Sequence, residues 1–355
     1  MISYLRDWYR RHFSDPQVAI LALLLVAGFA VVVLAGDILA PVLASLVVAY
    51  LLDGAVSWLT ARGMPRVAAV SLVFVTSLAV VVLMLLGVLP LMFKQVGQFI
   101  RDLPAMIGRG QGLLMQLPER YPSLFSPQQV QELIGGIRVE LVTYGQRVLS
   151  LSLSSVVGLI TIMVYFVLVP LLVFFFLKDK QRILAWSESF LPRDRRLANQ
   201  VWVEVNGKIA SYVRGKFMEI MIVWCVTYVT FAVLGINYAM LLSFLVGVSV
   251  IIPYVGAAVV TLPVAFVAYV QWGLESQFLY LMLAYGVIQF LDGNLLVPLL
   301  FSEVVNLHPV AIIVAVLLFG GLWGLWGVFF AIPLATLVQA VINSWPKAAE
   351  DAAGA

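Results

Sequence analysis

The sequence predicts an all-α integral membrane protein with eight or nine transmembrane helices. Of its 355 residues, 63% are hydrophobic and only 11% are charged, and the mean hydropathy is +1.05. Soluble domains are about half apolar and about a quarter charged, and a soluble fold could not hide this much apolar surface from water. The apolar residues also come in runs of about 20, which is the length that crosses a bilayer as a helix. We therefore expect the lipid bilayer to be its main partner.

Residues 1–93 are expected to hold a cytoplasmic tail and three spans. The first apolar run is followed by others like it, so it is interpreted as an uncleaved span rather than a signal peptide. Gly36-Asp37 is expected to form a tight turn between the first two spans. Asp53-Gly54, near the end of the second span, is expected to break that helix rather than to serve transport. The three spans are expected at about 18–35, 38–58 and 67–93.

Residues 94–150 have a different composition, with six Lys or Arg and four Asp or Glu. Apolar residues recur at helical spacing from Val130 to Val148. Ser126, Pro127 and Gln129 supply a hydroxyl N-cap, a proline at the first helical position and a glutamine at the third. The segment is therefore expected to be amphipathic, helical and extracytoplasmic.

The segment from 151 to 216 combines a fourth span, at 151–177, with a basic stretch. Residues 178–216 carry nine Lys or Arg against four acidic residues, and the apolar positions from Leu197 to Val213 form a helical stripe. Cationic loops stay in the cytoplasm. The N-terminus, the 59–66 loop and the 178–216 segment fall on one side after alternation through four spans, which predicts a cytoplasmic N-terminus.

The C-terminal transmembrane region, residues 217–346, contains no Lys or Arg, and residues 347–355 are expected to form a flexible tail. The run at 309–343 is too long for one crossing at about 1.5 Å per residue. The glycines at its centre, including Gly320 and Gly321, allow either a hairpin turn or small-residue packing on one long helix. The earlier spans in this region are expected at about 218–236, 238–254, 256–273 and 278–300.

Enzymes, metal sites and nucleic-acid binding are all disfavoured by the sequence. It lacks GxSxG, a Walker A lysine loop and HExxH, and no basic stripe is interleaved with aromatics. It has one cysteine and two histidines. We therefore expect no catalytic residues, no cofactor, no metal, no nucleic-acid partner and no self-contained ATP-driven pump.

Polar residues within apolar spans remain as candidate pathway residues, because each is costly in lipid. Asp292 is the strongest candidate, with Gln289 and Asn294 beside it and no nearby Lys or Arg to pair with. The alternative is that Asp292 caps a broken helix at Gly293, or bonds to Asn294 in a contact that packs helices together. Glu219, by contrast, is expected simply to pair with the cations just before it.

Two further groups are candidates for ion binding or gating. Glu303 and His308 precede the last run, where His308 is either a pH-sensitive gate or part of a helix-start turn. Pro253 and Gly256 interrupt an apolar stretch, which indicates either a broken helix around a cavity or an interfacial loop. Gly293, Gly320 and Gly321 complete the set of candidate helix breaks.

Several motifs, in order along the chain, resemble the autoinducer-2 exporter (AI-2E) family of permease-like proteins. Asp53-Gly54 departs from it where Asn-Pro is expected, and Ala257 stands where proline is usual. The resemblance implies a homo-oligomeric, multi-pass protein of the bacterial inner membrane that moves small molecules or ions without ATP. Some members are associated with export of a furanone signalling molecule and others with sodium/proton exchange. The motifs are Phe174–Lys180, Tyr212–Lys216, Ile252–Gly256, Asp292–Asn294 with Pro298, Leu307–Pro309 and Gly320–Ala335.

The function that these observations favour is secondary transport of a small molecule or an ion through the C-terminal region, with Asp292 as the coupling or binding residue. Two alternatives stay open. One is a membrane scaffold or regulator that acts through residues 94–150 and 178–216. The other is a passive channel lined by the small residues of the last helices.

Overall fold

A computed structural model describes residues 16–114, 126, 128, 135–136, 156–190, 196–301 and 307–344, and these are helical apart from short connections. Six helical segments among them are long and apolar enough to cross a membrane, and three shorter apolar helices accompany them. The all-α membrane architecture agrees with the sequence, whereas eight or nine crossings stays a prediction. Most of the expected 126–150 helix lies outside the described residues.

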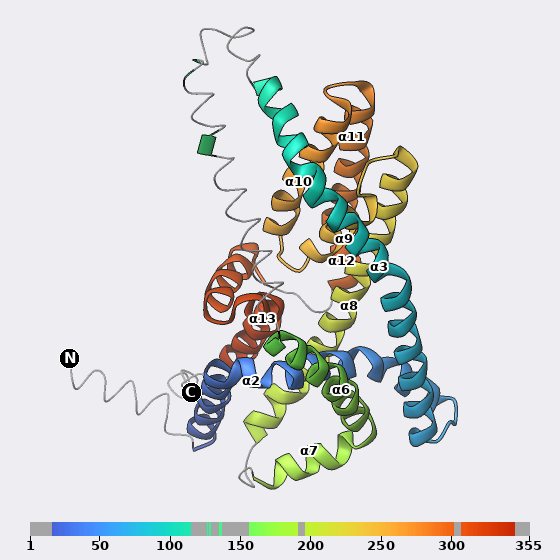
Figure 1. Ribbon diagram of the computed structural model, residues 1–355. Coiled ribbons are helices and arrows are strands. Elements are labelled where there is room, and N and C mark those ends of the chain that lie inside the picture. The colour runs from blue at the N-terminus through green and yellow to red at the C-terminus, as the bar shows by residue number, and fades with distance from the viewer. Residues whose placement is uncertain are drawn as a thin grey trace, which may run out of the picture.

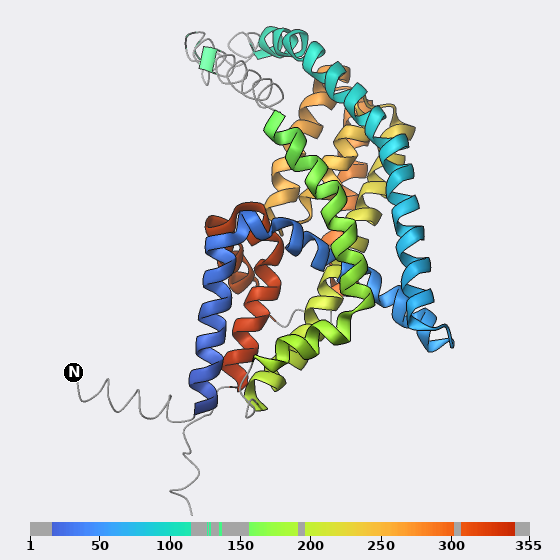
Figure 2. The same cartoon turned by 60° about the horizontal axis from the view of Figure 1, so that its bottom comes forward.

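Helix α2 (Pro16–Ala61) is continuous through Gly36-Asp37, so the tight turn expected there is wrong. Its two apolar pieces, Ile20–Val31 and Ile38–Ala61, flank that dipeptide. Figure 2 shows α2 changing direction instead of reversing. Pro41 lies inside the helix and cannot donate the usual hydrogen bond one turn back, which is a common cause of a kink.

Helix α3 (Arg66–Leu114) runs well past the expected end of the third span at residue 93. Its extension packs on the connection after α8: Gln95 Oε1 accepts a hydrogen bond from the Leu241 amide at 2.9 Å, and Tyr238 donates to Asp102 Oδ2 at 2.6 Å. Burial first, and then the Asp102 carboxylate, raise the pKa of Tyr238 to about 12. The Tyr238 hydroxyl is therefore a donor throughout the neutral range.

Helices α6 (Val156–Lys178), α7 (Lys180–Ser189) and α8 (Arg196–Leu234) follow. The last part of the basic stretch, from Arg196 onward, therefore lies in one helix with the next apolar run. Its apolar stripe packs as expected, with Val201 and Val205 buried against Leu21 of α2 and Ala340 near the C-terminus. Figure 1 shows α8 between two groups of helices, with α2, α7 and α13 around one end and α9 and α11 toward the other.

Helices α9 (Ala239–Ser249) and α10 (Val255–Trp272) form a tight antiparallel unit with the second half of α8. The α9 helix has 11 residues, which is too short to span a bilayer and shorter than the expected 238–254. By contrast, α10 agrees with the expected span at 256–273. The shared core includes Phe231, Leu242, Val246, Val264, Val267 and Leu281.

The expected span at 278–300 consists of three pieces: α11 (Ser276–Leu291), a π-helical segment η1 (Asp292–Leu296) and α12 (Val297–Phe301). In η1 the Val297 amide donates to the Asp292 carbonyl, five residues earlier. Short π segments inside α-helices are rare and are frequent at functional sites. The interruption falls on the Asp292-Gly293-Asn294 step.

Helix α13 (Pro309–Ser344) is two helical arms joined at Gly324, where φ is 58° and ψ is −134°. That left-handed backbone favours glycine. Ala315 and Phe319 of the first arm pack against Ala331 of the second, so the arms fold back on each other. Of the two alternatives left open by the sequence, the structure has the hairpin (Figure 2).

Candidate functional site

A cavity of about 360 Å³ lies where α8, the α9–α10 connection, α11, η1, α12 and α13 meet. We call it the central cavity. Its walls are largely apolar, and a small number of polar side chains converge on it. The polar and aromatic residues that matter for the chemistry are Tyr212, Lys216, Glu219, Gln289, Asp292 and Phe301.

A buried ion pair forms one wall of the central cavity. Lys216 Nζ lies 2.6 Å from Glu219 Oε2, and the two side chains are 4% and 3% exposed. The ammonium group also donates to the Val250 carbonyl at 3.1 Å, which ties α8 to the end of α9. It lies 5.1 Å from the centre of the Phe301 ring. Such a pair is costly to desolvate, so neither member is easily lost alone.

Two further polar atoms at the cavity have no hydrogen-bond partner among the described residues. Asp292 Oδ1 and Gln289 Nε2 are both buried, and neither makes a hydrogen bond within the described part of the chain. Asp292 follows α11 directly and Gln289 lies three residues earlier, so both face the cavity from one helix face. A buried polar group without a partner costs free energy, and it indicates a ligand, an ion or water at this position.

The α9–α10 connection closes one end of the cavity. Pro253 and Tyr254 line it, and Tyr254 has a φ of 63°, which is unusual for a residue other than glycine. A β-carbon on Gly256 would overlap the carbonyl of Ser249, so the chain can turn this tightly only with glycine there. The expected interruption at Pro253 and Gly256 is therefore a sharp return beside a cavity.

Of the remaining candidates, only Gly293 lines the cavity in the described part of the chain. Asn294 is exposed and donates to the Phe290 carbonyl at 2.9 Å. His308 is also exposed, and its Nδ1 accepts a hydrogen bond from the Val310 amide at 3.2 Å, as in a helix-start turn. A β-carbon on Gly320 would collide with the Val328 side chain and one on Gly321 would meet no atom within 4 Å, while the break itself is at Gly324. Glu303 lies outside the described residues.

Sequence reasoning paired Glu219 with a preceding cation but did not connect that pair with Asp292. The basic stretch ending at Lys216 resembles a solvated cytoplasmic loop, whereas α8 carries Lys216 into the interior. One signal was available: Lys216 and Glu219 are three residues apart, so they share one face of a helix, and the sequence after Glu219 is apolar.

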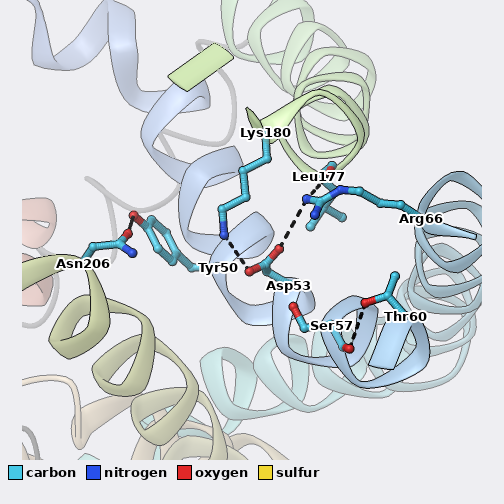
Figure 3. A network of polar contacts seen from close by, with 8 residues as sticks. All are labelled: Tyr50, Asp53, Ser57, Thr60, Arg66, Leu177, Lys180 and Asn206. Atoms are coloured by element: carbon cyan, nitrogen blue, oxygen red, sulfur yellow. Dashed lines mark hydrogen bonds and ion pairs between the residues drawn. The ribbon is translucent and has the colours of Figure 1, made fainter. Parts of the chain in front are cut away.

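A second polar group, which we call the Asp53 cluster, joins α2, α3, α6, α7 and α8 (Figure 3). Lys180 Nζ lies 2.8 Å from Asp53 Oδ2, and Arg66 lies 4.0 Å from Asp53 Oδ1 and donates to the Leu177 carbonyl. Tyr50 donates to Asn206 at 2.6 Å. The helix break expected at Asp53-Gly54 is wrong, because α2 passes through it and Asp53 is held by these cations.

Comparisons with known proteins agree with the membrane architecture. Residues 20–347 match the family described as "AI-2E family transporter". The chain is 48% identical over 346 residues to "Putative permease PerM" of Escherichia coli K12, which covers 98% of both chains. It is 26% identical over 296 residues to "Putative transport protein YueF" of Bacillus subtilis, covering 82% of this chain and 80% of the relative. Such descriptions are those of transporters rather than enzymes.

Proposed function

Because this chain belongs to the AI-2E transporter family and is a multi-pass membrane transport protein, we propose that it is a secondary transporter whose substrate path runs through the central cavity. The observation that carries the proposal is the pair of buried, unpartnered polar atoms on Asp292 and Gln289 facing that cavity. Polar groups inside a membrane protein are costly and face pathways or partners.

The position of the cavity supports alternating access. It is bounded by the sharp α9–α10 return, the π segment and the α13 hairpin, which are three breaks in regular helix. Transporters bind their substrates where helices are interrupted, because the freed backbone groups and small displacements of the half-helices are available there. Lys216 and Asp292 carry opposite charges and both line the cavity, so a bound ligand can change which groups attract one another.

The proposal includes a topology and an assembly. We infer a cytoplasmic N-terminus in the bacterial inner membrane, which the basic N-terminus, the 59–66 loop and the 178–216 segment support. Homo-oligomers and a substrate that is either an exported small molecule or an exchanged ion follow from the family resemblance. Cysteine labelling from each side of spheroplasts tests the topology, and native mass spectrometry tests the assembly.

The experiment that tests the path is flux into proteoliposomes under imposed sodium, proton and solute gradients. We expect saturable flux in the wild type and a loss of about tenfold or more in Asp292→Asn, since a single charge-assisted contact is worth that much. Asp53→Asn is the matched control, because it removes a carboxylate of the same protein that lies outside the central cavity.

Two results would count against this proposal. Saturable flux that survives Asp292→Asn unchanged would show that the substrate takes another path. Flux that rises linearly with concentration would indicate a passive channel instead of a transporter.

A further inference from the structure

We propose that the central cavity binds a small organic cation that also carries a hydroxyl or carbonyl oxygen, in the manner of an amino alcohol. This inference rests on the proposed function, because it names the class of substrate for the same site. It follows from the charges, the size and the wall chemistry of the cavity.

The charge of the cavity favours a positive ligand. Lys216 is neutralised by Glu219, with 2.6 Å between Nζ and Oε2. Asp292 also lines the cavity, and its Oδ1 has no hydrogen-bond partner among the described residues. Two carboxylates therefore share the cavity with one ammonium group, and within the described residues Asp292 forms no ion pair of its own. An anionic ligand would therefore be repelled, and a monocation would complete the site.

A bare metal ion fits the cavity poorly. Hard cations take about six to eight oxygen ligands at short range. Within the described part of the chain no three or more His, Cys, Asp or Glu side chains are grouped to hold a metal ion. About 360 Å³ is also far more room than one ion needs.

The aromatic walls suit a diffuse organic cation. Tyr212, Tyr254 and Phe301 all line the cavity, and the Tyr212 and Phe301 ring centres are 5.7 Å apart. An ammonium group already lies against this wall, since Lys216 Nζ is 5.1 Å from the centre of the Phe301 ring. Faces of aromatic rings attract cations and are used widely to recognise organic ammonium groups.

Gln289 supplies the second element of recognition. Its Nε2 is a buried donor without an acceptor in the described residues, one helical turn before Asp292. A ligand oxygen placed there would satisfy the amide while the ligand's positive end meets Asp292. A molecule with a cationic nitrogen and an oxygen a few bonds away matches both groups, whereas a purely apolar cation leaves Gln289 unpaired.

Equilibrium binding of choline to the full-length protein in lipid nanodiscs tests the inference directly. Choline is compared by titration calorimetry with 3,3-dimethylbutan-1-ol, which has the same shape and hydroxyl but no charge, and with sodium chloride. We expect saturable choline binding, with the neutral analogue weaker by about tenfold or more. Asp292→Asn should weaken choline binding by a similar factor. Gln289→Leu should reduce the difference in affinity between choline and tetramethylammonium, which lacks the oxygen.

Glu275→Gln is the matched control, because Glu275 is an exposed carboxylate at the start of α11 whose side chain makes no cap hydrogen bond. It should bind choline as the wild type does. Equal binding of choline and the neutral alcohol, or binding that survives Asp292→Asn, would overturn the inference. So would an absence of choline binding by protein that shows Asp292-dependent flux of other solutes, and the proposed path would then still stand. Conversely, choline binding without any choline flux would retain the ligand class and contradict transport.

Discussion

The Asp53 cluster and the central cavity each bring a lysine close to a carboxylate, at 2.8 and 2.6 Å, yet their surroundings differ. In the Asp53 cluster the side chains of Lys180 and Asp53 are 37% and 21% exposed, and a second cation, Arg66, lies 4.0 Å from the carboxylate. In the cavity the side chains of Lys216 and Glu219 are almost fully buried, and a further carboxylate, Asp292, lines the same space. In the Asp53 cluster two cations surround one carboxylate and connect helices. In the cavity two carboxylates share one ammonium group beside an open volume, as expected of a binding site.

Removing the lysine from each site gives the largest expected contrast. Lys216→Met leaves Glu219 buried without its counter-charge, which should cost about 3–5 kcal/mol of unfolding free energy. Lys180→Met should lower the unfolding free energy by about 1 kcal/mol or less, since the Lys180–Asp53 pair is partly exposed. Unfolding by SDS titration in mixed micelles measures both values. Equal losses of stability in the two variants would contradict the distinction between a buried and an exposed pair. If adding Glu219→Leu to Lys216→Met restored most of the stability, the unpaired Glu219 carboxylate would be the cause of the loss.

Glycine substitutions probe the backbone around each site with a smaller effect. In Gly256→Ala the new methyl group would overlap the Ser249 carbonyl, so we expect a loss of about 1–3 kcal/mol. In Gly54→Ala the nearest atom is Cδ of the flexible Arg214 side chain at 3.4 Å, and alanine favours the helix by about 1 kcal/mol. Thermal unfolding in detergent should show opposite shifts. A stable Gly256→Ala protein would mean that the α9–α10 return is less tight than the structure has it.

Salt dependence gives the smallest and most specific contrast. Double-mutant cycles for Lys180 with Asp53 and for Lys216 with Glu219 would be measured at about 0.1 M and about 1 M sodium chloride, where the screening length falls from about 10 to about 3 Å. The exposed pair should lose most of a coupling of about 1 kcal/mol or less, and the buried pair should keep its coupling. A salt-sensitive Lys216–Glu219 coupling would indicate that water and ions reach the cavity freely.

Much of the architecture was predictable, because apolar runs and helix length are tightly linked in a membrane protein. The end of α6 and the whole of α10 fall within a residue or so of the expected spans. The turn and the helix break wrongly expected in α2 come from interpreting Gly36-Asp37 and Asp53-Gly54 as turn or break signals. Both dipeptides lie within α2, and Asp53 is stabilised there by Lys180, which is distant in sequence.

The candidate site was predictable only in part, for a related reason. Asp292, Gln289 and Pro253 are polar or helix-breaking residues in apolar sequence, and all three line the cavity. Their roles stay predictions. The pairing of Glu219 with a preceding cation was expected, and the structure confirms it with Lys216. The association of that pair with Asp292 was not predicted, because it depends on tertiary contacts: α8 enters the interior just where the basic stretch ends.

The π segment from Asp292 to Leu296 sets the angular register between α11 and α12. A π turn holds one residue more than the α-helical turn it replaces, and each residue of an α-helix turns the chain by about 100°. Deleting Gly293 would therefore restore an ordinary helix but rotate Asp292 by about that angle relative to Phe301. The carboxylate and the ring would then no longer be directed into the same cavity. The extra residue acts as an insertion that lets one continuous helix direct side chains from both of its halves into the same space.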